Sequence, residues 1–346
     1  MLCNWGAFRP NSGRRANLMD NASTAAAPGE SCRNAIAPAP ARRRRSRNRV
    51  TWKLFSCKDR VLWPFLHFLK YGLPYRVGLK RRICDGRDIK RINLLAVEHC
   101  ANSCQHCSTS SPFAQRRSYP AAAFFPWLDT VVQCGIKFSQ LAITGGEPFL
   151  HEDLGVLIKQ LKVRYPDKVL GVTTNFFWAN EQKIAELAPR LQGLDKLLIS
   201  KYPNITKKLG GEARFEALVR VLRELCPQIE IAVSDGSYMI AWQLNPEKQH
   251  PNANCCTSDC YVLRADGQVS HCAVGAGIEN RREYASIVIN SKERLYDLRR
   301  GIEGFLTWAR KYPFDLCFHC TLWRGHRVTW EREPSYFRNT SCAIAL

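Results

Sequence analysis

The feature that most constrains the fold of this 346-residue chain is a regular alternation of apolar runs and helical patterns between residues 89 and 245. Each short apolar run is expected to form a strand, and the segment after it carries apolar residues at helical spacing. Strands that are apolar along their whole length indicate a parallel sheet covered by helices. We therefore predict an α/β protein with its functional residues at the carboxyl ends of the strands.

The expected elements are enough for an incomplete TIM-like barrel. Strands are predicted around Leu94 and at residues 138–144, 169–174, 196–200 and 229–233, with a candidate sixth at 238–244. Helices are predicted at residues 120–134, 153–165, 181–191 and 214–225. This segment, residues 89–245, is expected to be the core domain.

Three cysteines follow the first expected strand in a C-x3-C-x2-C spacing, Cys100, Cys104 and Cys107. Three thiolates can hold three irons of a [4Fe–4S] cluster and leave the fourth iron open, whereas electron-transfer clusters of this type use four cysteines. Chemistry can occur at the open iron, so a compact group of three favours catalysis. A zinc knuckle or unrelated buried thiols are the structural alternatives for the same residues.

A Gly-Gly-Glu-Pro motif containing Gly145, Gly146 and Glu147 ends the second expected strand. Two glycines allow the backbone to approach a ligand closely. The Glu147 carboxylate can accept charge-assisted hydrogen bonds from an ammonium group. Asn175 and Ser200 follow the third and fourth expected strands, where they either line the same site or serve as an Asx turn and a loop cap.

Together the two motifs resemble those of the radical S-adenosylmethionine (radical SAM) superfamily, in which an aromatic residue or His, here His106, precedes the last cysteine. The resemblance implies a six-stranded partial (β/α) barrel, a [4Fe–4S] cluster on the three cysteines, and S-adenosylmethionine (SAM) bound by its methionine amine at the Gly-Gly-Glu-Pro motif. It also implies that Asn175 and Ser200 lie near the SAM ribose and carboxylate. In such enzymes a 5′-deoxyadenosyl radical removes hydrogen from the substrate, and an electron donor such as a flavodoxin or ferredoxin is expected.

Cysteines return in residues 246–325, where the strand–helix alternation has ended. Residues 261–271 are expected to form a β-hairpin because Asp266-Gly267 is a strong turn signal between alternating residues. A helix is expected at residues 293–312. The cysteines of this region are Cys255, Cys256, Cys260, Cys272, Cys317 and Cys320.

This second cysteine group resembles the twitch/SPASM extension of radical SAM enzymes, written C-x9–15-G-x4-C with a later C-x2-C pair. Gly267 supplies the glycine of that pattern. The resemblance implies one auxiliary [4Fe–4S] cluster, in which Cys256 is the preferred first ligand, Cys255 also fits and Cys260 is the rival. The ligands that complete the set are Cys272, Cys317 and Cys320. A four-cysteine zinc site is the alternative.

The formal net charge of +21 is concentrated before the first cysteine motif. Residues 1–50 lack helical or strand periodicity and are expected to be disordered, so the basic run at 42–49 is interpreted as a solvated tail rather than a nucleic-acid or anionic-membrane contact. Residues 51–88 are aromatic and basic with helical spacing, and are expected to pack on the edge of the barrel. Residues 326–346 are expected to be a tail.

The sequence also indicates in which cellular compartment the protein resides and whether it spans a membrane. No apolar run approaches the ~20 residues of a membrane span, and no signal-peptide pattern opens the chain. The cysteines fall in tight groups, which favours metal binding over a disulfide framework. A cytoplasmic protein without a membrane span is therefore expected.

Oxidation of a sugar or aminocyclitol-like alcohol is the preferred activity, because an auxiliary cluster could accept the electron from a substrate radical. A peptide-modifying radical SAM enzyme is the nearest alternative. Four residues that follow the fourth and fifth expected strands are candidates either for the substrate pocket or for packing: Tyr202, Asp235, Tyr238 and Trp242. A zinc- or Fe–S-containing nucleic-acid-binding protein would explain the charge and the C-terminal cysteines, but neither the Gly-Gly-Glu-Pro motif nor the strand–helix alternation.

Overall fold

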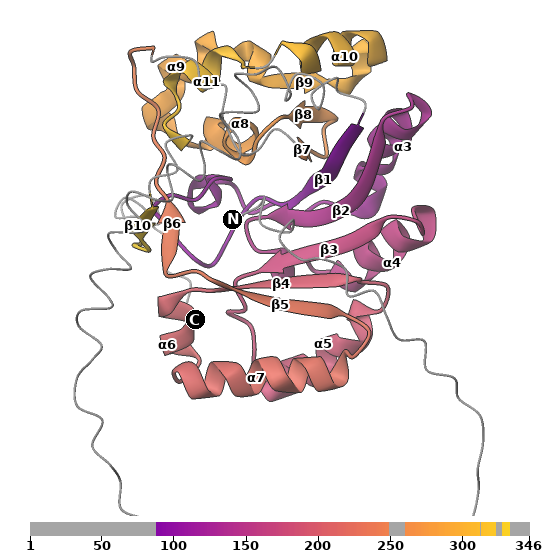
Figure 1. Cartoon of the computed structure of the whole chain (residues 1–346), viewed down its shortest axis with the longest axis vertical. Coiled ribbons are helices and arrows are strands. Elements are labelled where there is room, and N and C mark those ends of the chain that lie inside the picture. The colour runs from indigo at the N-terminus through magenta and orange to yellow at the C-terminus, as the bar shows by residue number, and fades with distance from the viewer. Residues whose placement is uncertain (1–87, 249–259, 312, 323–326, 333–346) are drawn as a thin grey trace, which may run out of the picture.

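The computed structural model describes residues 88–248, 260–311, 313–322 and 327–332, and one mostly parallel sheet runs through it (Figure 1). The strand order is β5-β4-β3-β2-β1-β7-β8-β9. Strands β1 to β5 are parallel, β7 joins β1 in parallel, and β8 and β9 are antiparallel. The strands are β1 (Asp88–Val97), β2 (Lys137–Gly145), β3 (Val169–Thr174), β4 (Lys196–Lys201), β5 (Glu230–Asp235), β7 (Cys260–Leu263), β8 (Gln268–Ser270) and β9 (Leu295–Asp297).

Helices connect the parallel strands and cover the sheet (Figure 1). The α-helices are α3 (Phe125–Gln133), α4 (Leu154–Arg164), α5 (Glu181–Leu187), α6 (Pro203–Lys208), α7 (Glu212–Leu225), α8 (Ala273–Gly277), α9 (Ala285–Asn290), α10 (Ile302–Arg310) and α11 (Asp315–His319). Short 3-10 turns are η4 (Ser111–Phe113), η5 (Ala121–Ala123), η6 (Pro148–Leu150), η7 (Ala188–Leu191), η8 (Ile278–Asn280), η9 (Arg282–Tyr284), η10 (Lys292–Arg294) and η11 (Leu298–Arg300). None of the helices in the described ranges is long and apolar enough to cross a bilayer.

The core lies between the sheet and these helices, and it confirms the predicted α/β class. Leu94 and Val97 of β1 are completely buried, as are Val172 of β3 and Ile199 of β4. Helix α7 buries one face, which includes Phe215. Full burial of such side chains stabilises the fold by about 1.5–3 kcal/mol each. The parallel strands and their covering helices are consistent with part of a TIM-like barrel.

Two element predictions are wrong in detail. The candidate sixth strand does not join the main sheet among the described residues: β6 (Tyr238–Ile240) is short and pairs antiparallel with β10 (Arg327–Thr329). Its partner comes from the far end of the chain, which no local pattern reveals. The predicted helix over residues 293–312 is interrupted by β9 and by Gly301, whose φ of 86° lies in the left-handed region, so helix α10 begins only at Ile302.

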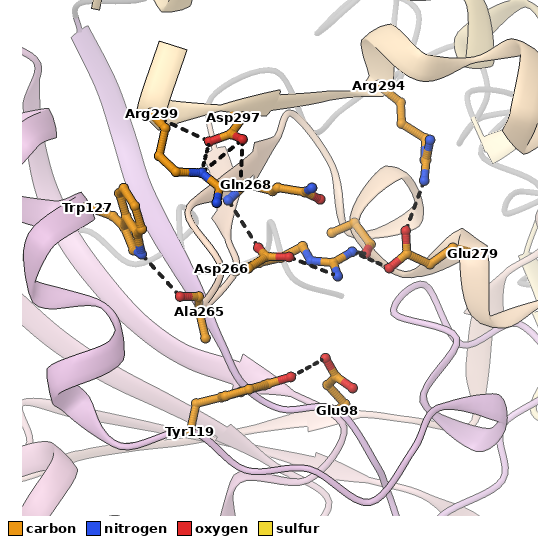
Figure 2. Close-up of polar contacts among 12 residues, drawn as sticks. Glu98, Tyr119, Trp127, Ala265, Asp266, Gln268, Glu279, Arg294, Asp297 and Arg299 are labelled. Carbon is orange, nitrogen blue, oxygen red and sulfur yellow. Dashed lines mark hydrogen bonds and ion pairs between the residues drawn. The ribbon is translucent and has the colours of Figure 1, made fainter. Parts of the chain in front are cut away.

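The β7–β8 hairpin is attached to the barrel through its tip (Figure 2). The indole N–H of Trp127 on α3 donates to the Ala265 carbonyl at 3.1 Å. Gly267 has φ of 83°, and a Cβ there would lie 2.7 Å from the Trp127 ring, so only glycine fits at this turn. Within the extension, Glu279 forms an ion pair with Arg294 (Figure 2) and another with Arg264. The cysteine-rich extension therefore continues the barrel sheet through β7, and the Trp127 side chain attaches the hairpin tip to helix α3.

The predictions for residues 1–50 and 51–88 fall almost entirely outside the described residues, and so do Cys255 and Cys256.

Candidate cluster and cofactor site

The three cysteines of the first motif lie in the loop after β1, and their side chains face one region. The side chains of Cys104 and Cys107 lie close enough to Cys100 for both to raise its pKa. The hydroxyl of Tyr202, just after β4, interacts electrostatically with all three thiols. The Cys107 backbone N–H also donates to the Cys104 carbonyl at 3.2 Å, which turns the loop on itself. The structure thus brings the three predicted ligands together at the carboxyl ends of β1 and β4.

The donor set of this loop fits an iron–sulfur cluster. Within the described ranges, no three His, Cys, Asp or Glu side chains are close enough together to hold one metal ion. In a [4Fe–4S] cube each thiolate binds a different iron, so its ligands stand farther apart than the four ligands of one tetrahedral zinc ion. Three thiols that are near one another, but too far apart to bind the same metal ion, are compatible with that wider spacing.

Burial raises the pKa of two of these thiols. The Cys100 pKa lies well above its ordinary value because the side chain is desolvated, with a further increase from Glu147. Burial raises the pKa of Cys104 to about 12. Without a metal the Cys100 and Cys104 thiols are therefore protonated at neutral pH, and metal binding would release protons from them.

Glu147 is almost fully buried, with 1% of its surface exposed, and is held by three donors. Its Oε1 accepts hydrogen bonds from the Thr174 hydroxyl at 2.7 Å and the Phe149 N–H at 3.1 Å, and its Oε2 accepts one from the Asn175 N–H at 2.7 Å. Burial raises the Glu147 pKa to about 7, although these hydrogen bonds oppose the shift. A carboxylate has about four acceptor positions, so one position remains for a further donor such as an ammonium group.

Gly145 and Gly146 bring the loop after β2 against the loop before Cys100. A Cβ on Gly145 would lie 1.8 Å from the Val97 carbonyl oxygen, and a Cβ on Gly146 would lie 1.8 Å from that of His99. The Glu147 N–H donates to the same His99 oxygen at 3.0 Å. We predicted that the glycines admit a ligand, but the contact that requires them is with the chain's own backbone. They position the glutamate beside the cysteine loop.

Asn175 contacts both halves of the site. Its side-chain Nδ2 donates to the Cys100 sulfur at 3.5 Å, while its backbone N–H donates to Glu147. Its Oδ1 accepts from the Phe177 N–H at 3.0 Å, which is the Asx turn considered as the structural alternative. The Asx turn is therefore present, and a role of Asn175 beside SAM stays a prediction. Ser200 is buried at the end of β4, and its side chain hydrogen bonds with Tyr202.

Two tryptophans support the cysteine loop from later parts of the chain. Trp242 is buried, its indole N–H donates to the His106 carbonyl at 3.1 Å, and the His106 Nδ1 lies 3.2 Å from the Trp242 carbonyl. The indole N–H of Trp330 donates to the Cys104 sulfur at 3.1 Å. Trp242 was considered as a pocket or packing residue, and its contacts are those of packing. Trp330 was missed, because no spacing or motif marks an isolated tryptophan.

The structure also gathers most of the second cysteine group. Cys272 precedes α8, where its sulfur accepts the Gly275 N–H at 3.1 Å, and Cys317 lies within α11. Burial raises the Cys317 pKa, and Cys272 and Cys320 raise it further, so these three side chains lie near one another. Cys260 begins β7, and the β7–β8 ladder that pairs Val262 with Ser270 would place Cys260 opposite Cys272 if it continued. Its sulfur accepts a hydrogen bond from Arg91 at 3.6 Å.

No protein-family model matches the sequence. The curated relatives include the GTP 3',8-cyclase of Sulfurovum sp. (strain NBC37-1), 28% identical over 153 residues that make up 43% of this chain and 45% of the relative. The GTP 3',8-cyclase of Sulfurimonas denitrificans (strain ATCC 33889 / DSM 1251) is 32% identical over 131 residues, 36% of this chain and 40% of the relative. These relatives are radical SAM enzymes, and the matched part of the chain spans less than half of their length.

Solved structures with a similar arrangement include BtrN in complex with AdoMet and 2-DOIA, with a TM-score of 0.42, 13% identity, and coverage of 67% of this chain and 93% of that chain. Streptococcus suis SuiB bound to S-adenosylmethionine has a TM-score of 0.31, 12% identity, and coverage of 69% and 72%.

Proposed function

We propose that this chain is a radical SAM enzyme that holds a [4Fe–4S] cluster on Cys100, Cys104 and Cys107 and binds SAM against Glu147. The observation that carries the proposal is the double contact of Asn175, which reaches the Cys100 sulfur at 3.5 Å and the Glu147 carboxylate at 2.7 Å. A thiol group and a buried carboxylate with one acceptor position left thus share a site at the ends of β1, β2 and β3. The sequence relatives support the same chemistry.

The cluster and SAM would supply the reaction when bound: one electron cleaves the S–C5′ bond of SAM, giving methionine and a 5′-deoxyadenosyl radical that removes a hydrogen atom from the substrate. The residues of this chain would bind and orient. Glu147 would accept hydrogen bonds from the methionine ammonium of SAM. Its three protein donors fix the carboxylate in one orientation, so little side-chain entropy remains to be lost on binding.

The test is SAM cleavage by the purified protein. The full chain is reconstituted with iron and sulfide under anaerobic conditions, reduced with dithionite and incubated with SAM, and 5′-deoxyadenosine is measured by chromatography. We expect the product with reductant and none without it. A protein that contains a [4Fe–4S] cluster, is reduced and still forms no 5′-deoxyadenosine would refute the proposal. Such a result would favour a binding protein over an enzyme.

Replacing Glu147 by glutamine is expected to weaken SAM binding about 10- to 100-fold, because a hydrogen bond to a charged group contributes about 1.5–3 kcal/mol. In the parent protein the carboxylate with a pKa of about 7 must be ionised to bind an ammonium group. Affinity is therefore expected to be constant above pH 7 and to fall about tenfold per pH unit below it. In Glu147→Gln this pH dependence should disappear.

Calorimetric titration of SAM into the oxidised, cluster-containing protein between pH 5.5 and 8.5 would measure both effects without turnover. The matched control is Glu152→Gln, since Glu152 is an exposed carboxylate a few residues along the same loop. The control should bind SAM like the parent. Equal affinities of Glu147→Gln and the parent at pH 8 would exclude Glu147 as the ammonium ligand.

We also propose an auxiliary [4Fe–4S] cluster held by Cys272, Cys317 and Cys320, with Cys260 or Cys256 as the fourth ligand. The mutual proximity of the first three supports it. The double variant Cys272→Ala/Cys317→Ala is expected to lose one of two clusters, measured as iron and zinc per chain by mass spectrometry. Loss of zinc with unchanged iron would identify a zinc site instead. Single Cys260→Ala and Cys256→Ala variants would then show which cysteine completes the set.

For the substrate we propose oxidation of a sugar or aminocyclitol-like alcohol, in which the auxiliary cluster accepts the electron of the substrate radical. The names of the sequence relatives favour a second candidate, GTP. A flavodoxin or ferredoxin would supply the reducing electron. Incubation with GTP or with an aminocyclitol, in parallel, distinguishes the candidates, because the true substrate is consumed in step with 5′-deoxyadenosine formation. If neither compound is consumed, a peptide substrate becomes the leading alternative.

A further inference from the structure

Residues 327–332 cross the cysteine loop and are hydrogen bonded on both sides; we call them the crossing segment. On one side β10 pairs with β6, and the Trp330 N–H donates to the Ser237 carbonyl at 2.8 Å. On the other side the Gln105 N–H donates to the Glu331 carbonyl at 3.0 Å. A further β-bridge joins Arg332 to Cys104 itself. The backbone of this distant segment is thus tied to the loop that carries the three cysteines.

The side chain of Trp330 is directed at one of these cysteines. Its indole N–H donates to the Cys104 sulfur at 3.1 Å, well inside the range of hydrogen bonds to sulfur. The Tyr202 hydroxyl also hydrogen bonds with Cys104. The two rings lie 6.1 Å apart between centroids, inclined at 48°. Cys104 is therefore approached by aromatic donors from two separate elements, the turn after β4 and the crossing segment.

The other two thiols have different hydrogen-bond partners, either within two residues of the cysteine or directly after β3. Cys100 accepts hydrogen bonds from the Asn102 N–H at 3.3 Å and from Asn175. The Cys107 sulfur lies 3.3 Å from the Thr109 hydroxyl. Trp330 is therefore a donor that reaches a cysteine sulfur of this loop from the C-terminal part of the chain. A tryptophan nitrogen can only donate a hydrogen bond, so Trp330 is the donor and the Cys104 sulfur is the acceptor.

We propose that Trp330 is a positioning residue that tunes the reduction potential of the cluster on Cys100, Cys104 and Cys107. This inference rests on the proposed function. Reduction adds negative charge to a cluster and its thiolates, and an N–H donor stabilises that charge. Hydrogen bonds to the sulfurs are among the factors that set cluster potentials. The Trp330 hydrogen bond is therefore expected to favour the reduced state.

The test is the potential of the reconstituted full chain carrying Trp330→Phe, which keeps an aromatic ring and removes the N–H. A redox titration monitored by electron paramagnetic resonance would follow the signal that SAM perturbs, since that signal reports the cluster on the first cysteine motif. We expect a shift to more negative potential with unchanged iron content. The matched control Val328→Ala loosens the crossing segment but keeps the donor, and its potential should equal that of the parent.

An unchanged potential in Trp330→Phe, with the cluster retained, would overturn the inference while leaving the proposed function intact. A parent protein without any SAM-perturbed cluster signal would instead refute the proposed function. If Trp330→Phe does not fold, replacement of Trp330 by β-(3-benzothienyl)alanine keeps the shape of the ring and exchanges the N–H for sulfur. The same negative shift is expected, and its absence there would overturn the inference equally.

Discussion

Replacing Cys104 by alanine is expected to reduce 5′-deoxyadenosine formation to background and to remove the SAM-perturbed cluster. Cys104 is only 6% exposed and lies between the other two cysteines in the loop, with the Trp330 donor directed at its sulfur. Its loss would leave two thiolates, which cannot hold three irons of a cube. Iron content, absorbance and product formation, measured on the same reconstituted preparation, would show both losses together.

The control for this experiment is Cys134→Ala. Cys134 follows helix α3, and the charged group that acts on its thiol is Glu303 of the extension, outside the first cysteine motif. The control should keep its iron and its activity. Circular dichroism would establish that both variants are folded. Undiminished 5′-deoxyadenosine formation by Cys104→Ala would show that the cysteine loop is not the site of SAM cleavage.

Replacing Gly146 by alanine is expected to move the loop that carries Glu147 away from the loop that carries the three cysteines. The added Cβ would lie 1.8 Å from the His99 carbonyl oxygen and 2.2 Å from its carbon, so the backbones must move apart. That movement would break the hydrogen bond from the Gly146 N–H to the Val97 carbonyl, now 2.7 Å long, and displace Glu147. Overpacking a well-fitted interior costs typically 1–3 kcal/mol, and for a contact with rigid backbone we expect more than about 3 kcal/mol.

Denaturant unfolding and SAM titration would measure the two consequences of Gly146→Ala. Gly135→Ala is the matched control, because Gly135 has φ of 71° but open space around its Cβ position. The control should lose about 1–2 kcal/mol from the left-handed backbone alone and should bind SAM normally. If Gly146→Ala were no less stable than this control and bound SAM equally well, the backbone contact would not be what positions the glutamate.

Much of the barrel was predictable because its signals are local. The apolar run of β1 and the helical spacing in α7 each report burial within a few residues of the chain. The same reasoning failed at β6, which was expected in the barrel and pairs with β10 instead. It also failed before Ile302, where apolar spacing suggested a longer helix but a strand and Gly301 intervene.

Within the site, the sequence identified residue types more reliably than their contacts. The Gly-Gly-Glu-Pro motif was placed correctly at the end of a strand, because the apolar run of β2 leads directly into its first glycine. The function of its glycines was not predictable, since the backbone they approach, at Val97 and His99, lies at the end of a different strand and in the loop after it. The contacts of Asn175 were likewise not predictable, since its side chain reaches Cys100 and its backbone N–H reaches Glu147, both on other strand connections.

The order of motifs along the chain was enough to predict three thiols and a glutamate at neighbouring strand ends of an α/β sheet, because parallel strands place their carboxyl ends along one edge. The contacts of Asn175 with these groups, and that of Trp330 with Cys104 across 226 residues of chain, became visible in the folded protein alone. Periodicity reports which residues are buried, a local property. Which buried groups contact one another depends on the order of the strands in the sheet and on the path of the later segments past them. Both depend on the packing of the whole molecule.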